Sequence, residues 1–199
     1  MNFVKQLGER FLSSDYCRRA FTHRSVSVQN NERLEYLGDS LLGFFIADWL
    51  YKHYSTYSEG DLTRLRAHLV RKETLAAIAR EQDLGDFLVL GAGELKSGGV
   101  RRDSILADTL EALIGAVYLS DGFERARTFV LDLYTTRLQS IPAVDQLKDA
   151  KTRLQELLQS NGVALPEYML KEKLGKSGNE IFTIECKIKD CAVQFMGTG

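Results

Sequence analysis

Two acidic segments, 31–40 and 105–118, hold the side chains with the clearest chemistry in this chain. Their carboxylates follow the spacings i, i+3, i+7 in the first segment and i, i+3 in the second: Glu32, Glu35, Asp39, Asp108 and Glu111. Side chains at such spacings share one face of a helix, with Cβ atoms roughly 5–6 Å apart. An acidic face among large apolar residues needs a counter-charge, and a divalent metal ion is the candidate.

Each acidic segment also contains a glycine, Gly38 in the first and Gly115 in the second. Glycine inside a helix costs roughly 0.5–1 kcal/mol relative to alanine, so its use here favours a close approach of two helices. If the helices cross at these glycines, four acids converge: Glu35, Asp39, Asp108 and Glu111. A hard cation that prefers oxygen ligands, Mg²⁺ or Mn²⁺, would offset their repulsion better than Zn²⁺. A solvated acidic face is the alternative.

The elements that must position these acids are predicted to be helices throughout the first 140 residues. No proline interrupts this part, because Pro142 and Pro166 both follow it. The stretch 34–50 is apolar nearly all round, which indicates a buried helix, and the SEGD sequence at 58–61 has the form of a helix start. Glycine content predicts a loop at 91–102. The other expected helices are 62–81, 103–119 and 123–139.

A change of pattern after residue 140 predicts a second, smaller domain. We divide the chain into a helical domain at 1–140, a linker at 141–147 and a C-terminal domain at 148–199. A short helix at 148–160 is followed by apolar–polar alternation at 181–188, which is typical of a strand with one buried face. Further strands are expected at 168–174 and around 193–195. The predicted fold class is therefore mainly α, an all-helical domain followed by an α+β domain of order helix–strand–strand–strand.

Composition limits the function classes without naming one. No apolar run is long enough to span a bilayer, and the charged N-terminal sequence does not have the form of a signal peptide. Three cysteines without a CxxC pair predict reduced thiols in a cytoplasmic protein. The net charge of −1 neither indicates nor excludes a nucleic-acid partner, since local patches matter more than sums.

The motifs themselves resemble those of the bacterial ribonuclease III family. NERLEYLGDSLL is similar to the family signature, with Tyr36 where phenylalanine is usual. Other family-like motifs follow the family order: AFTHRS at 20–25, EGDLTRLRA at 59–67, GELKSGG at 93–99 and the stretch 105–122. The resemblance covers nearly the whole chain.

The resemblance implies a Mg²⁺-dependent endoribonuclease that cuts double-stranded RNA as a homodimer, with Mn²⁺ as a plausible substitute. It assigns metal binding to Glu35, Asp108 and Glu111, and catalysis to Asp39 and Glu111. Its products would be 5′-phosphate and 3′-hydroxyl ends with a short 3′ overhang, and its substrates would include ribosomal RNA precursors. Glu32 and Glu59 match supporting acids or ordinary surface acids, whereas we expect His23 to have a structural role.

The C-terminal part resembles the double-stranded RNA-binding domain of the same enzymes. The stretch 149–159 matches its first helix, and four residues match positions that reach the RNA minor groove: Thr152, Gln155, Glu156 and Gln159. The family's final lysine-rich helix is absent from the chain, so we expect an incomplete domain with a bare apolar sheet face. Residues 148–199 carry eight Lys and Arg against seven Asp and Glu, a net +1 that predicts weak phosphate binding.

Two alternatives to the nuclease hypothesis come from other function classes. A non-catalytic RNA-binding regulator could use the same scaffold, because a fold does not fix a function. A protein whose acids are merely solvated would have no metal site at all. Retention of all four core acids argues against the regulator.

Overall fold

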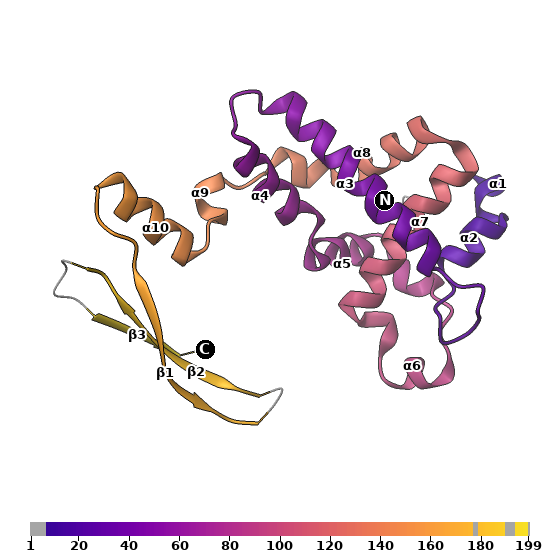
Figure 1. Cartoon of the computed structure of the whole chain (residues 1–199). Helices are drawn as coiled ribbons and strands as arrows, with labels where there is room; N and C mark the ends of the chain where they lie inside the picture. The colour runs from indigo at the N-terminus through magenta and orange to yellow at the C-terminus, as the bar shows by residue number, and fades with distance from the viewer. Residues whose placement is uncertain (1–6, 177–178, 190–193, 199) are drawn as a thin grey trace. The chain divides into compact units, whose positions relative to one another are not determined.

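The chain divides into two compact units, 1–144 and 145–199. The computed structural model describes residues 7–176, 179–189 and 194–198. Helices α1 to α8 lie in the first unit (Figure 1): α1 (Glu9–Leu12), α2 (Asp15–Ala20), α3 (Glu32–His53), α4 (Glu59–Val70), α5 (Lys72–Glu81), α6 (Ala92–Lys96), α7 (Asp103–Asp121) and α8 (Phe123–Gln139). The described part of this unit also contains two short 3-10 turns, η2 (Leu84–Phe87) and η3 (Gly99–Arg101). The predicted loop at 91–102 thus contains α6 and η3.

Helix α7 forms the centre of the first unit. Eleven of its residues are buried, including Leu110, Leu113 and Ile114. Helices α2, α3, α5 and α8 all pack against it. A helix that is covered on several sides needs apolar residues nearly all round, which is the pattern that the sequence shows for 103–119.

Residues 62–81 form two helices, whereas the sequence predicted one. Arg71 separates α4 from α5 in an extended conformation (φ −66°, ψ 152°). Near the break, the carbonyl oxygen of Leu69 accepts a hydrogen bond from the buried hydroxyl of Tyr134 (3.1 Å). The change of direction lets α4 pack against α3 and α5 pack against α7. Neither glycine nor proline marks the break, so sequence pattern alone could not locate it.

The second unit contains α9 (Val144–Leu147, whose first residue belongs to the first unit), α10 (Ala150–Ser160) and three strands. The strands β1 (Glu167–Leu174), β2 (Ile181–Lys187) and β3 (Gln194–Thr198) form an antiparallel sheet in the order β1-β2-β3. Cys186 lies opposite Tyr168 on one side and Phe195 on the other. These elements confirm the predicted fold class and the order helix–strand–strand–strand along the chain, and residue 193 of the third predicted strand lies outside the described residues.

One face of this sheet is apolar and open. Phe182, Ile184 and Cys186 of β2 line a groove of about 740 Å³ together with residues of α10 and β3. Phe195 is 57% exposed there. On β2, Glu185 alternates with these residues and forms ion pairs with Lys171 (2.8 Å) and Lys187 (3.5 Å). The alternation predicted for 181–188 therefore does separate an apolar from a charged face. Among the described helices, none combines the length and the apolar character that crossing a bilayer requires.

Candidate active site

The acidic residues are positioned by a close crossing of α3 and α7. A Cβ atom built on Gly38 of α3 would overlap the backbone carbonyl of Glu111, with the carbonyl carbon only 2.5 Å away. A Cβ atom on Gly115 of α7 would likewise overlap the carbonyl oxygen of Leu34. The two backbones therefore touch at two glycines, one on each helix. Any larger residue there would separate the helices that bear the acids.

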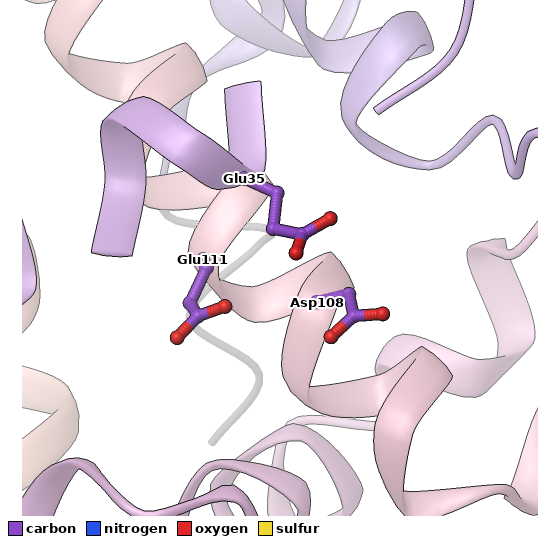
Figure 2. A group of neighbouring side chains, drawn as sticks. All are labelled: Glu35, Asp108 and Glu111. Carbon is purple, nitrogen blue, oxygen red and sulfur yellow. The ribbon is translucent and has the colours of Figure 1, made fainter. Parts of the chain in front are cut away.

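Three carboxylates converge beside this crossing (Figure 2). Glu35 from α3 and Asp108 and Glu111 from α7 each offer an oxygen, and these oxygens all lie within 4.8 Å of one another. Asp39, one turn further along α3, is exposed and lies outside this group. Its charge still acts on the Glu111 carboxyl. The structure thus brings together three of the four core acids and places the fourth nearby.

The electrostatic cost of this arrangement falls mainly on Glu111. Burial, together with the charges of Asp39, Asp108 and Glu35, raises the pKa of its carboxyl from 4.5 to about 8, and burial is the largest of these causes. Burial also raises the pKa of Glu35, helped by Asp108 and Glu32. The pKa of Asp108 is raised by burial as well, although the nearby His23 and Arg24 oppose this. A cluster that resists ionisation is one that a bound cation would stabilise.

The donor set decides which cation would fit. All three converging ligands are carboxylate oxygens, without histidine or cysteine in the group. Oxygen ligands suit Mg²⁺ and Mn²⁺, while structural and catalytic zinc sites use nitrogen or sulfur as well. The residues present therefore fit a hard divalent cation.

Comparison with known proteins identifies the family. A family model described as Ribonuclease-III-like matches residues 14–138. The protein named Ribonuclease 3 of Buchnera aphidicola is 52% identical over 195 residues, covering 98% of this chain and 86% of its own length. The Ribonuclease 3 of Vibrio vulnificus is 52% identical over 197 residues, with 98% and 87% covered. The chain belongs to the ribonuclease III family. Membership makes it an endoribonuclease and confirms the resemblance seen in the sequence.

Solved structures of ribonuclease III proteins agree with this membership. A nuclease domain of ribonuclease III from Campylobacter jejuni, described as having flexibility in a region involved in dimer formation, superposes with a TM-score of 0.63. It is 37% identical, and the match covers 69% of this chain and 99% of that one. Dicer from Pichia stipitis matches with a TM-score of 0.52 at 24% identity, over 94% of this chain and 86% of that one, and so supports the fold alone.

Around the ribonuclease III acids, the structure adds a basic rim that sequence reasoning missed. A pocket of about 380 Å³ is lined by Glu35 and Asp108 and also by His23, Arg24 and Arg102. Both arginines lie in or beside family-like motifs, but no local pattern signals that these segments meet. His23 itself accepts a hydrogen bond at Nδ1 from the backbone N–H of Ser25 (3.2 Å). This bond is of the kind expected for a structural histidine.

The two supporting acids occupy different places. The carboxylate of Glu32 lines the acidic pocket and accepts a hydrogen bond from the Asn30 amide (3.1 Å). Glu59, in the first turn of α4, lines a different, largely apolar pocket with Phe44 and Tyr51. Within one copy of the chain, Glu32 is therefore a neighbour of the acid cluster, whereas Glu59 borders another surface.

The four residues predicted to contact RNA all lie on α10. The Thr152 hydroxyl donates a hydrogen bond to Asp149 (2.9 Å), and Glu156 accepts one from Lys148 (2.7 Å). Gln155 is half-buried and Gln159 is exposed. Thr152 and Glu156 thus already have hydrogen-bond partners at the start of α10.

The raised pKa of Glu111 predicts a pH-dependent stability for the metal-free protein. The folded state keeps this proton up to about pH 8, whereas the unfolded chain loses it near 4.5. Stability should therefore fall as pH rises through this window, and the Glu111 charge should cost on the order of 2–4 kcal/mol at pH 8. Because glutamine cannot ionise, we expect Glu111→Gln to be more stable than wild type at pH 8 in EDTA. Urea denaturation measures the difference.

Well below pH 4.5 the two proteins should be equally stable, since the Glu111 carboxyl is then protonated in both the folded and the unfolded state. In Mg²⁺ the order should reverse at pH 8, because the ion binds only the wild-type site. Equal stability of variant and wild type at pH 8 in EDTA would show that the Glu111 charge does not destabilise the metal-free fold.

Proposed function

We propose that this protein is a divalent-metal-dependent endoribonuclease that hydrolyses phosphodiester bonds in double-stranded RNA. The observation that carries the proposal is the convergence of Glu35, Asp108 and Glu111 from two helices that cross at glycines. Family membership supplies the reaction class, and the carboxylates supply the means of holding a cation. We assign residues 1–140 to the nuclease domain, 141–147 to the linker and 148–199 to the RNA-binding domain.

Each acid has a proposed role. Glu35, Asp108 and Glu111 would hold Mg²⁺, for which Mn²⁺ could substitute. The ion, when bound, supplies Lewis-acid stabilisation of charge on the phosphate and makes the attacking water more acidic. Asp39 is exposed beside the cluster, where its carboxylate can accept a hydrogen bond from that water and orient it for in-line attack. We propose Asp39 and Glu111 as the catalytic residues. Asp39 would orient the water, and Glu111 lies deepest among the converging acids.

We propose that the active form is a homodimer. The related Campylobacter jejuni nuclease domain has a region involved in dimer formation. Large aromatic residues of α3 are exposed in a single copy, including Tyr36 at 79% and Tyr51 at 74%. Two copies would present two sites to one duplex, so each strand would be cut once. The products would be 5′-phosphate and 3′-hydroxyl ends with a short 3′ overhang, generated in the cytoplasm from ribosomal RNA precursors and other structured RNAs.

The second unit would hold the duplex by its shape. Thr152, Gln155, Glu156 and Gln159 of α10 are polar side chains that can hydrogen-bond to ribose 2′-hydroxyls and base edges in the wide RNA minor groove. Such contacts do not depend strongly on sequence. Glu156 would exchange its present partner Lys148 for RNA groups on binding.

A cleavage assay on labelled duplex RNA tests the proposal. We expect cleavage in Mg²⁺ or Mn²⁺, none in EDTA, and recovery when metal is restored. Product ends should be ligatable 5′-phosphates, and sedimentation should show a two-chain species. A separate test concerns the RNA-binding residues. A Gln155→Ala, Gln159→Ala double variant should bind duplex RNA more weakly than wild type and should keep the wild-type melting temperature.

Three outcomes would contradict parts of this proposal. Undiminished cleavage in EDTA would exclude a metal role. Tight duplex binding without cleavage in any divalent metal would favour the non-catalytic regulator. Single-chain behaviour under cleavage conditions would exclude the homodimer.

A further inference from the structure

We propose that Arg24 and Arg102 each bind a backbone phosphate of the RNA substrate at the rim of the acidic pocket. This inference rests on the proposed function and adds binding residues to it. Both side chains line the same pocket of about 380 Å³ as Glu35 and Asp108. Arg24 lies in the loop before α3, and Arg102 lies immediately before α7.

The loop that bears Arg24 is fixed to the segment 89–91 by backbone and side-chain contacts. Thr22 forms a parallel bridge with Val89, and the His23 N–H donates to the Val89 carbonyl (3.1 Å). The N–H of Gly91 donates to the Ser25 hydroxyl (2.9 Å), and a Cβ atom on Gly91 would lie 2.7 Å from the Ser25 carbonyl oxygen. Arg24 therefore projects from between two anchored residues.

Hydrogen bonds at His23 further hold the loop that bears Arg24. Since the Ser25 N–H donates to Nδ1 of His23 (3.2 Å), this nitrogen carries no proton in the neutral ring. The Ser25 hydroxyl, 2.8 Å away, then donates to Nδ1 and accepts from Gly91. The chain from Gly91 through Ser25 to His23 holds the loop that carries Arg24 against the segment leading to α6.

Each arginine is oriented by an acid but keeps donors free. Arg24 Nη1 lies 3.4 Å from Glu32, and Arg102 Nη1 lies 3.0 Å from Glu94. Arg102 also donates to the Ser97 hydroxyl (3.2 Å). A guanidinium has five N–H donors in a planar fork, and this fork matches the oxygens of a phosphate. The Arg24 side chain is 71% exposed and the Arg102 side chain 46%, so both remain accessible to a ligand.

The charge balance of the pocket explains why such residues are needed. An RNA phosphate that approaches Glu35, Asp108 and Glu111 meets a cluster of its own sign. A divalent ion offsets part of this repulsion, and cations on the rim can offset more while fixing the path of the backbone. Both arginines line the pocket that Glu35 and Asp108 border, so their charges act on a phosphate that enters it.

Duplex-RNA binding in EDTA, at several KCl concentrations, tests the inference without cleavage. We expect Arg24→Gln and Arg102→Gln each to weaken binding about 5–10-fold at 0.1 M salt. Each should reduce the slope of log K against log salt by about 1, and the double variant by about 2. In Mg²⁺ the loss should appear in KM, with kcat at saturating RNA changed less than about threefold. Arg10→Gln, an exposed arginine on α1, is the matched control and should behave as wild type.

Lysine variants separate charge from the guanidinium fork. Arg24→Lys and Arg102→Lys keep the charge, so we expect an unchanged salt slope with binding weakened about threefold. They also carry the test if a glutamine variant fails to fold, which thermal melting reveals. Wild-type affinity in all folded variants overturns the inference while the proposed function stands. A wild-type protein that neither binds nor cleaves duplex RNA overturns the proposed function itself.

Discussion

Replacing Glu111 with glutamine is expected to lower the rate of duplex-RNA cleavage at least about 1000-fold, which corresponds to about 4 kcal/mol of lost transition-state stabilisation. Glu111 lies deepest among the converging acids, and its oxygen is within 4.8 Å of ligand oxygens from Glu35 and Asp108. The amide keeps the shape of the side chain but removes the negative charge that a cation requires. Single-turnover kinetics with saturating enzyme in Mg²⁺ measure the chemical step directly.

A matched control guards this prediction against general effects of charge. Glu124 lies on α8 with its side chain 81% exposed, and Arg127 Nη1 lies 3.8 Å from its carboxylate. Glu124→Gln should therefore change the rate less than about twofold, as is usual for exposed ion pairs. Binding of duplex RNA in EDTA should be the same in all three proteins. A Glu111→Gln enzyme that cuts at the wild-type rate would show that our role for this residue is wrong.

Replacing Gly38 with alanine should damage both the fold and the site. The added Cβ would overlap the backbone carbonyl of Glu111, and backbone atoms cannot move aside as a flexible side chain can. We expect a loss of at least about 3 kcal/mol in the free energy of unfolding. Because the helices would separate at the residue that bears the central carboxylate, cleavage should fall about 100-fold or more in the protein that remains folded.

Gly43 provides the control within the same helix. A Cβ atom there meets nothing within 4 Å. Gly43→Ala should therefore be neutral or stabilise the protein by about 0.5–1 kcal/mol, the usual difference between the two residues in a helix. Urea denaturation and cleavage rates should be measured for both variants. Equal effects of the two substitutions would show that helix propensity, and not close backbone contact, determines the role of Gly38.

The acid cluster could be anticipated because its information is local. The i, i+3 spacing of Asp108 and Glu111 fixes their common face as soon as a helix forms. Gly38 and Gly115 mark the crossing because a helix uses glycine at a cost, and the structure does bring the two backbones together there. The spacing did not determine which of the four acids could bind one cation together. In the structure Glu35, Asp108 and Glu111 form that group, and Asp39 lies outside it.

Other features depended on contacts between distant residues. The chain turns at Arg71 near the carbonyl of Leu69, which the hydroxyl of Tyr134, 65 residues later, hydrogen-bonds. The loop that bears Arg24 of the basic rim is held by the hydrogen bond from Gly91 to Ser25, 66 residues earlier. No sequence pattern indicates the break at Arg71 or the meeting of the Arg24 loop with Gly91, because these partners become neighbours only after folding.

By itself, then, the sequence determined the helical and strand classes, the family and the residue types able to hold a hard cation, because hydrophobic period and side-chain chemistry are properties of short segments. The tertiary structure alone decided how closely α3 and α7 approach, which three carboxylates meet and which arginines face them. Those outcomes depend on distances between segments that no spacing along the chain encodes, and they are set by the packing of α7 against its neighbours.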